Sequence, residues 1–148
     1  CTWPETVVIM KFLSKLSTVA LLLAVALSSI VSNAEARPKR LSSDEVTALL
    51  RGNTVYGFNP NDETSYVMFH AVNGRVRAEL SSIDRTVSKS DGRWWVNDLG
   101  QLCVEWENFR WISSCATVNE NEGVITFTDD NGRIISFGEI EVGNPDGI

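Results

Sequence analysis

Turn-forming clusters recur from Asn59 to Gly132 at intervals that are too short for helices of ordinary length. Asn73-Gly74 and Asn131-Gly132 are the most specific, because asparagine and glycine accept the positive φ that two-residue hairpin turns demand. The remaining clusters are Asn59-Pro60-Asn61-Asp62, Asp91-Gly92, Asp98-Leu99-Gly100 and Glu122-Gly123. This spacing favours short strands that pair with their neighbours in sequence, as in an antiparallel sheet.

Eight runs of strand-forming residues lie between these turns. They are residues 54–58, 65–72, 75–80, 93–97, 102–107, 111–118, 124–128 and 133–137. Strands in this order, with almost no helix, predict an all-β domain whose antiparallel meander forms a calycin-like barrel or half-barrel. A β-sandwich is the alternative fold.

One short helix is expected before the strands. Ser42 can cap its first turn, and Glu45 stands three residues later, where it completes a capping box. Gly52-Asn53 is a natural stop. Val46, Leu49 and Leu50 fall on one side of this helix, so we expect it to plug or flank the β-core.

The segment Met10–Ala36 has the three parts of a secretory signal. Lys11 and Lys15 form a basic start, residues 16–30 are apolar, and Ala34-Glu35-Ala36 offers small residues for cleavage. We therefore expect an exported protein. A membrane anchor is the alternative, but the apolar run is shorter than the roughly 20 residues that cross a bilayer core.

The expected organisation follows from this signal, since Met10 is the natural start of the leader. We divide the chain into 1–9 as upstream translation, 10–36 as signal peptide, 37–41 as a basic N-terminal lead, 42–142 as a single β-rich domain, and 143–148 as a frayed tail.

The net charge is −6 at neutral pH, and residues 1–36 do not change it, because they carry two lysines and two glutamates. An acidic domain argues against nucleic acid or an anionic membrane as partner. We expect a monomer without a stable membrane anchor after cleavage, whose partner is an unidentified protein or a small apolar ligand.

Cys103 and Cys115 are the two cysteines of the expected mature chain. If they face each other in a hairpin centred on Phe109, Trp106 lies opposite Ile112, and the apolar residues share the face away from the sulfurs. Directly opposed residues come close enough to bridge, and exported proteins keep disulfides. The spacing matches no usual zinc site, so a structural disulfide is predicted.

Several short motifs together resemble a family of small exported bacterial β-domains of unknown function. They are Gly52-Asn53-Thr54-x-x-Gly57, Gly92-x-Trp94-x-Val96, and Leu102-Cys103-x-x-Trp106 followed by Cys115. The resemblance implies export in a Gram-negative bacterium, hence a periplasmic or secreted protein, and a calycin-like or other antiparallel β architecture. It brings no activity and no catalytic residues. The doubled Trp94-Trp95 departs from the pattern and puts an indole on each face of its strand.

The tryptophans are the candidate binding residues. Trp94 and Trp95 must point to opposite faces of one strand, and in the expected hairpin register so must Trp106 and Trp111. If Trp94 and Trp106 face inward, Trp95 and Trp111 form an exposed patch near the disulfide. The alternative is that most of these indoles are core residues.

The sequence offers little for catalysis, and no catalytic residue, cofactor or metal is expected. His70 is the one histidine of the chain, and it lies in a strand-like run without a nucleophile motif. Asp129-Asp130-Asn131-Gly132 begins like a calcium loop but lacks the later ligand positions, so a hairpin turn explains it better.

Two function classes remain open: protein interaction and ligand binding. The expected inward stripe is bulky, which favours a filled core; it comprises Trp94, Val96, Leu102, Val104, Trp106 and Ile112. This favours a non-enzymatic exported envelope protein that acts by protein interaction. The alternatives are binding of a small apolar or amphipathic ligand in a barrel mouth, and hydrolase or inhibitor activity.

Overall fold

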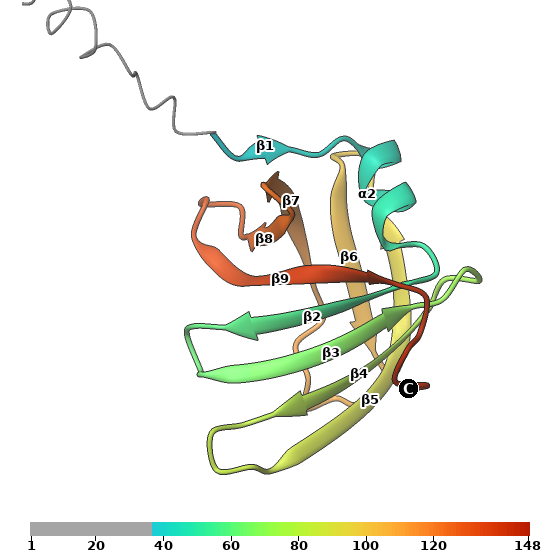
Figure 1. Cartoon of the computed structure of the whole chain (residues 1–148), viewed down its shortest axis with the longest axis vertical. Coiled ribbons are helices and arrows are strands. Elements are labelled where there is room, and N and C mark those ends of the chain that lie inside the picture. The colour runs from blue at the N-terminus through green and yellow to red at the C-terminus, as the bar shows by residue number, and fades with distance from the viewer. Residues whose placement is uncertain (1–36) are drawn as a thin grey trace, which may run out of the picture. The chain divides into compact units, whose positions relative to one another are not determined.

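A computed structural model describes residues 37–148, so the expected leader and upstream segment lie outside the described residues. Strands β2 to β9 form a closed antiparallel barrel, and the short β1 is added to it (Figure 1). The strands are β1 (Lys39–Arg40), β2 (Asn53–Asn59), β3 (Thr64–His70), β4 (Arg75–Ser81), β5 (Val87–Val96), β6 (Gln101–Trp106), β7 (Ser114–Asn121), β8 (Val124–Thr128) and β9 (Ile134–Val142).

The barrel is a simple meander. Each strand from β2 to β9 pairs with the next one in sequence, and β9 returns to pair with β2, from Asn53 opposite Val142 to Phe58 opposite Phe137. Closure removes the unpaired edges that an open sheet would expose. The predicted barrel is therefore confirmed, and the sandwich alternative is wrong.

Helix α2 (Ser43–Leu50) closes one end of the barrel (Figure 1). The predicted capping box is present, with Ser42 and Glu45 each bonded to the other's backbone or side chain. Val46 and Leu50 are fully buried in the barrel core. Gly52, at φ +79°, then turns the chain into β2, and its N–H donates to the carbonyl oxygen of His70.

Cys103 lies opposite Cys115 and the two are bonded, with Cα atoms 4.0 Å apart. The predicted pairing of Trp106 with Ile112 is wrong, because β7 begins only at Ser114 and residues 107–113 form a loop. The N–H of Trp106 donates instead to the side chain of Ser113, at 3.0 Å. Ile112, expected inside the barrel, is 85% exposed.

The turn predicted at Asp91-Gly92 is wrong. Both residues lie within β5, which begins at Val87. A Cβ at position 92 would come within 2.3 Å of the carbonyl oxygen of Glu105 on β6. The glycine therefore permits a close approach of two backbones rather than a reversal of the chain.

Both ends of the described chain are tied to the barrel. Arg40 of the expected N-terminal lead pairs with Asn119 through β1. The tail after Val142, expected to be frayed, is bonded to β2. Thr54 donates its hydroxyl hydrogen to the carbonyl of Gly143, and the Tyr56 hydroxyl donates to Asp146 at 2.6 Å.

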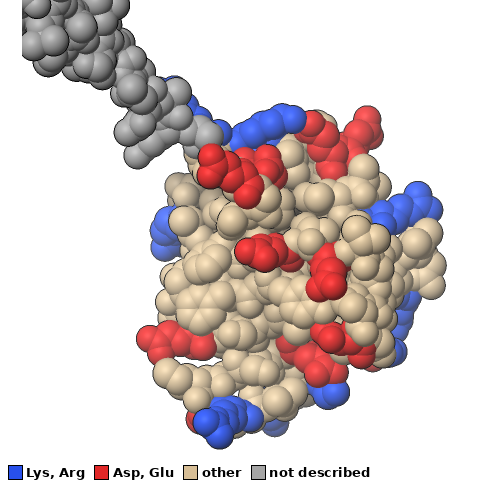
Figure 2. Space-filling view, in the orientation of Figure 1, with Lys and Arg blue, Asp and Glu red and all other residues tan. Residues whose placement is uncertain are grey.

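On the face that Figure 2 shows, acidic side chains lie over the middle and basic side chains lie mainly along the edges. This face therefore offers no basic patch for a polyanion. Within residues 37–148, no helix is long and apolar enough to cross a membrane.

Candidate binding cavity

A cavity of about 550 Å³ lies inside the barrel. Most of its walls come from the half of the barrel remote from α2. At that end β2, β4, β6 and β8 finish, and β3, β5, β7 and β9 begin. The lining is mostly apolar and includes Val55, Tyr66, Met68, Leu80, Leu102, Val104, Trp106, Trp111, Ala116, Phe127 and Ile135. A volume of roughly 300–1,000 Å³ with such walls is typical of small-molecule sites.

Small residues border this cavity on two strands: Ser114 and Ala116 on β7, and Ser136 on β9. Gly57 on β2 makes room for the ring of Tyr66, because a Cβ there would lie 2.2 Å from that ring. Gly138 on β9 permits a close approach of two backbones, because a Cβ there would lie 2.4 Å from the carbonyl oxygen of Tyr56. The predicted filled core is wrong for this half of the barrel, because the bulky residues that supported it came only from β5, β6 and the loop after β6.

One polar contact lies within the apolar walls. The hydroxyl of Tyr66 on β3 and that of Ser136 on β9 are 3.0 Å apart. Both residues line the cavity, and Ser136 is only 7% exposed. Burial raises the pKa of Tyr66 above its ordinary value, so this phenol stays protonated at neutral pH.

The loop between β6 and β7 supplies one wall of the cavity. The rings of Trp106 and Trp111 meet edge to face with centroids 4.7 Å apart. The indole N–H of Trp111 donates to the hydroxyl of Ser88 at 3.1 Å, and the backbone N–H of Asn108 donates to the hydroxyl of Ser90 at 3.4 Å. Two serines of β5 thus fix the position of the β6–β7 loop by hydrogen bonds.

The candidate patch residues lie in different surroundings. Trp95 is 46% exposed on the outer face of β5, where its cross-strand neighbour is Cys103, as predicted. Trp111 is half-buried and lines the cavity. Trp111 does not follow the alternation of a strand, because it lies in the loop between β6 and β7. Binding by either indole stays a prediction.

The mouth of the cavity carries two charged residues of opposite sign. Asp62 lies between β2 and β3, and Arg110 lies between β6 and β7. These loops are on different sides of the barrel, since β5 and β4 separate β6 from β3 in the strand order. The Arg110 guanidinium lies 5.9 Å from the centroid of the Phe109 ring, which is 90% exposed.

His70 lies at the other end of the barrel and does not line the cavity. It is fully buried, with its ring edge-on to that of Trp94 at a centroid distance of 5.4 Å. Within the described residues, neither of its ring nitrogens has a hydrogen bond of normal geometry. Burial lowers the pKa of His70 to about 4, and the nearby backbone of Met68 and Asn53 offsets this only in part.

The calcium-like segment is a turn, as predicted. The carboxylate of Asp129 accepts the backbone N–H groups of Asn131 and Arg133, both at 2.9 Å, and pairs with the Arg133 guanidinium. These contacts lower the pKa of Asp129. In residues 37–148, no three His, Cys, Asp or Glu side chains are grouped closely enough to hold a metal ion.

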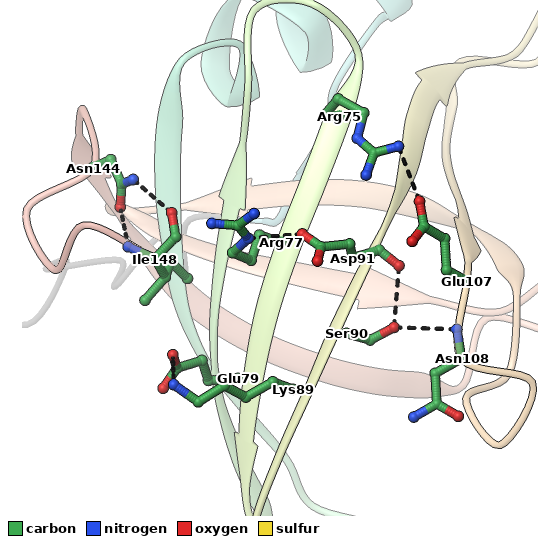
Figure 3. A network of polar contacts seen from close by, with 10 residues as sticks. All are labelled: Arg75, Arg77, Glu79, Lys89, Ser90, Asp91, Glu107, Asn108, Asn144 and Ile148. Carbon is green, nitrogen blue, oxygen red and sulfur yellow. Dashed lines mark hydrogen bonds and ion pairs between the residues drawn. The ribbon is translucent and has the colours of Figure 1, made fainter.

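A second hollow, on the outer wall over β4 and β5, is polar (Figure 3). Its charges largely neutralise one another: Arg77 pairs with Asp91 at 2.7 Å, and Lys89 pairs with Glu79. Just beyond it, Arg75 pairs with Glu107 at 2.9 Å. Exposed pairs of this kind each stabilise a fold by roughly 0–1 kcal/mol. The interior cavity is therefore the stronger candidate site.

The fold and the cavity define a class: a small, closed eight-stranded barrel, plugged by a helix at one end and hollow at the other. A family model described as "Protein of unknown function (DUF995)" matches residues 18–134, and the chain belongs to this family. The match agrees with the resemblance to a family of unknown function. Comparisons with curated proteins and with solved structures gave no match.

Proposed function

We propose that this domain is an exported binding protein that takes up a small apolar molecule through the open end of its barrel. The observation that carries the proposal is the cavity of about 550 Å³ with its largely apolar walls. A core that served stability alone would be packed to high density, and voids of this size are rare in such cores.

The chemistry of the lining supports binding rather than catalysis. Its polar side chains are hydroxyls, one amide, Asp62 and Arg110, and the lining contains no histidine or cysteine. His70, the histidine of the chain, lies in the core near α2, and its lowered pKa keeps it neutral at physiological pH. Among the described residues, the Asp62 carboxylate accepts the backbone N–H of Thr64 and has no hydrogen bond to a hydroxyl of the lining.

The proposed location rests on the leader-like segment and agrees with the disulfide between Cys103 and Cys115. N-terminal sequencing of the protein recovered from the periplasm or medium should begin at Arg37. Protein that is found only in the membrane fraction with residues 10–36 attached would contradict export.

Binding can be tested with the fluorescent probe anilinonaphthalene sulfonate, whose emission rises in apolar surroundings. The oxidised, folded protein should bind it saturably. Ser114→Phe should weaken this binding by roughly tenfold, because Ser114 lines the cavity and a phenyl group there occupies the space. Near-ultraviolet circular dichroism must stay native, since partly folded proteins also bind this probe.

Ser65→Phe is the matched control, because Ser65 is exposed on the outer face of β3 at the same end of the barrel. It adds an equal apolar group outside the cavity and should leave probe binding unchanged. Absence of saturable binding by the wild-type protein, or equal effects of the two variants, would show that the cavity is not the site.

A further inference from the structure

We infer that the ligand carries a neutral acceptor oxygen, such as a ketone, ester or amide carbonyl, which binds the Tyr66–Ser136 hydroxyl pair inside the cavity. This inference rests on the proposed function and adds the chemical class of the ligand. It follows from the number of hydrogen-bond donors at this pair.

Two hydroxyl groups meet within the cavity, and each has one hydrogen to donate. The contact of 3.0 Å between Tyr66 and Ser136 uses one of these hydrogens, whichever residue donates. Among the described residues, neither side-chain oxygen has another hydrogen-bond partner. One O–H group is therefore left to donate, in a place with apolar walls.

The surroundings of this free donor make it selective. Ser136 is more than nine-tenths buried, and Gly57 lets the ring of Tyr66 lie close against β2. A buried polar group without a partner is unfavourable by roughly 1–3 kcal/mol, so a ligand that accepts this hydrogen bond gains over one that cannot. A purely hydrocarbon ligand would leave the donor unsatisfied.

The charge of the site favours a neutral acceptor over a carboxylate at this depth. Neither Tyr66 nor Ser136 carries a charge at neutral pH, since burial raises the pKa of Tyr66. The one cationic group of the lining, Arg110, is exposed in the β6–β7 loop. A carboxylate beside two hydroxyls alone would be desolvated without a counter-ion, which is strongly unfavourable.

The test compares two ligands of nearly equal shape, 2-acetylnaphthalene and 2-isopropenylnaphthalene, in which a C=CH₂ group replaces the C=O group. Each is titrated against protein that holds the anilinonaphthalene sulfonate probe, and displacement of the probe is measured. We expect the ketone to displace it at about a fivefold to tenfold lower concentration, the usual effect of one hydrogen bond.

The variants give a pattern that a general packing effect would not produce. Tyr66→Phe alone leaves the hydrogen of Ser136 free, and Ser136→Ala alone leaves that of Tyr66, so each single variant should keep a preference for the ketone. The double variant removes both donors and should bind the two ligands equally. Ser114→Ala removes a hydroxyl elsewhere in the lining and should keep the full preference.

The outcomes separate this inference from the proposed function. Displacement by both ligands with equal strength in the wild-type protein would overturn the inference and leave the apolar binding site standing. A preference that survives in the double variant, or disappears in Ser114→Ala, would place the anchor elsewhere and also overturn it. Displacement by neither ligand would count against the cavity itself as a site for molecules of this kind.

Discussion

The two ends of the barrel use their apolar side chains in different ways. At the α2 end, Leu50 and Trp94 are buried, and the indole N–H of Trp94 donates to the carbonyl of Ala71 at 3.0 Å. At the other end, Trp111 is only half-buried, and Phe109 and Ile112 are exposed. The same eight strands thus form a packed core at one end and a cavity at the other.

This difference shows how one small barrel can combine stability with a hollow interior. Burial of apolar surface stabilises the fold in rough proportion to the area removed from water, and most of that burial lies toward α2. The open end gives up part of this stabilisation and keeps space for a ligand. Substitutions near α2 should therefore change stability, and substitutions near the mouth should change binding.

The largest expected effect comes from one leucine at each end. Leu50→Ala should lower the free energy of unfolding by about 4 kcal/mol, because the side chain is fully buried and leaves a cavity. Leu80→Ala should lower the free energy of unfolding by only about 1–2 kcal/mol, because Leu80 is half-buried and already borders the cavity. Urea denaturation of both variants measures this, and equal losses would break the comparison.

The disulfide should give the next largest effect, and it acts mainly on the open end. Cys103 and Cys115 close a segment with a sequence separation of 12, and this segment includes the loop that carries Trp111. Replacing both cysteines by serine should lower the free energy of unfolding by about 3 kcal/mol. It should also weaken probe binding, whereas Leu50→Ala, studied where it is folded, should not.

The closed end should also show a distinctive dependence on pH. The pKa of His70 is about 4 in the folded protein, against an ordinary value of 6.5. As the pH falls below 6.5, His70 becomes protonated in the unfolded chain but stays neutral in the folded protein until the pH nears 4. The free energy of unfolding therefore falls. The expected loss is about 2 kcal/mol between pH 7 and pH 5.

His70→Leu is the control for this prediction, since it removes the titrating group and keeps an apolar side chain in the core. Its free energy of unfolding should change less between these pH values than that of the wild-type protein, by about 2 kcal/mol. Parallel pH profiles for the two proteins would mean that His70 does not set the dependence.

The smallest stability effects should come from the two tryptophans of the predicted patch. Trp111→Ala should lower the free energy of unfolding by about 1 kcal/mol, because it removes the ring contact with Trp106 and the hydrogen bond to Ser88. Trp95→Ala should lower it by about 0.5 kcal/mol. Trp111→Ala should weaken probe binding, because Trp111 lines the cavity, and Trp95→Ala should not. Loss of capture of a protein partner in Trp95→Ala alone would instead support interaction through the outer face.

Local patterns in the sequence predicted the elements that depend on neighbouring residues. The capping box of Ser42 and Glu45 and the turn at Asp129 are made within a few residues of chain, so their residue types suffice to identify them. The register of Cys103 opposite Cys115 follows from strict alternation along two adjacent strands. The meander order follows from turns too short for any other connection.

The errors of prediction concern contacts between distant parts of the chain. Asp91-Gly92 has the composition of a turn, and only the approach of Glu105 shows why glycine is needed within a strand. Trp111 was placed by counting alternation through a segment that is a loop. Its position depends on a hydrogen bond to Ser88, which is 23 residues away.

The sequence by itself therefore determined the helix, the disulfide register, the meander and the approximate place of each barrel strand, because alternation, capping and turn chemistry act over a few residues. The tertiary structure alone decided the site. Barrel closure brings β2 beside β9, where Gly57 makes room for the ring of Tyr66, and Tyr66 reaches Ser136, 70 residues later in the chain. Residues on separate strands line one cavity only when the barrel closes around it.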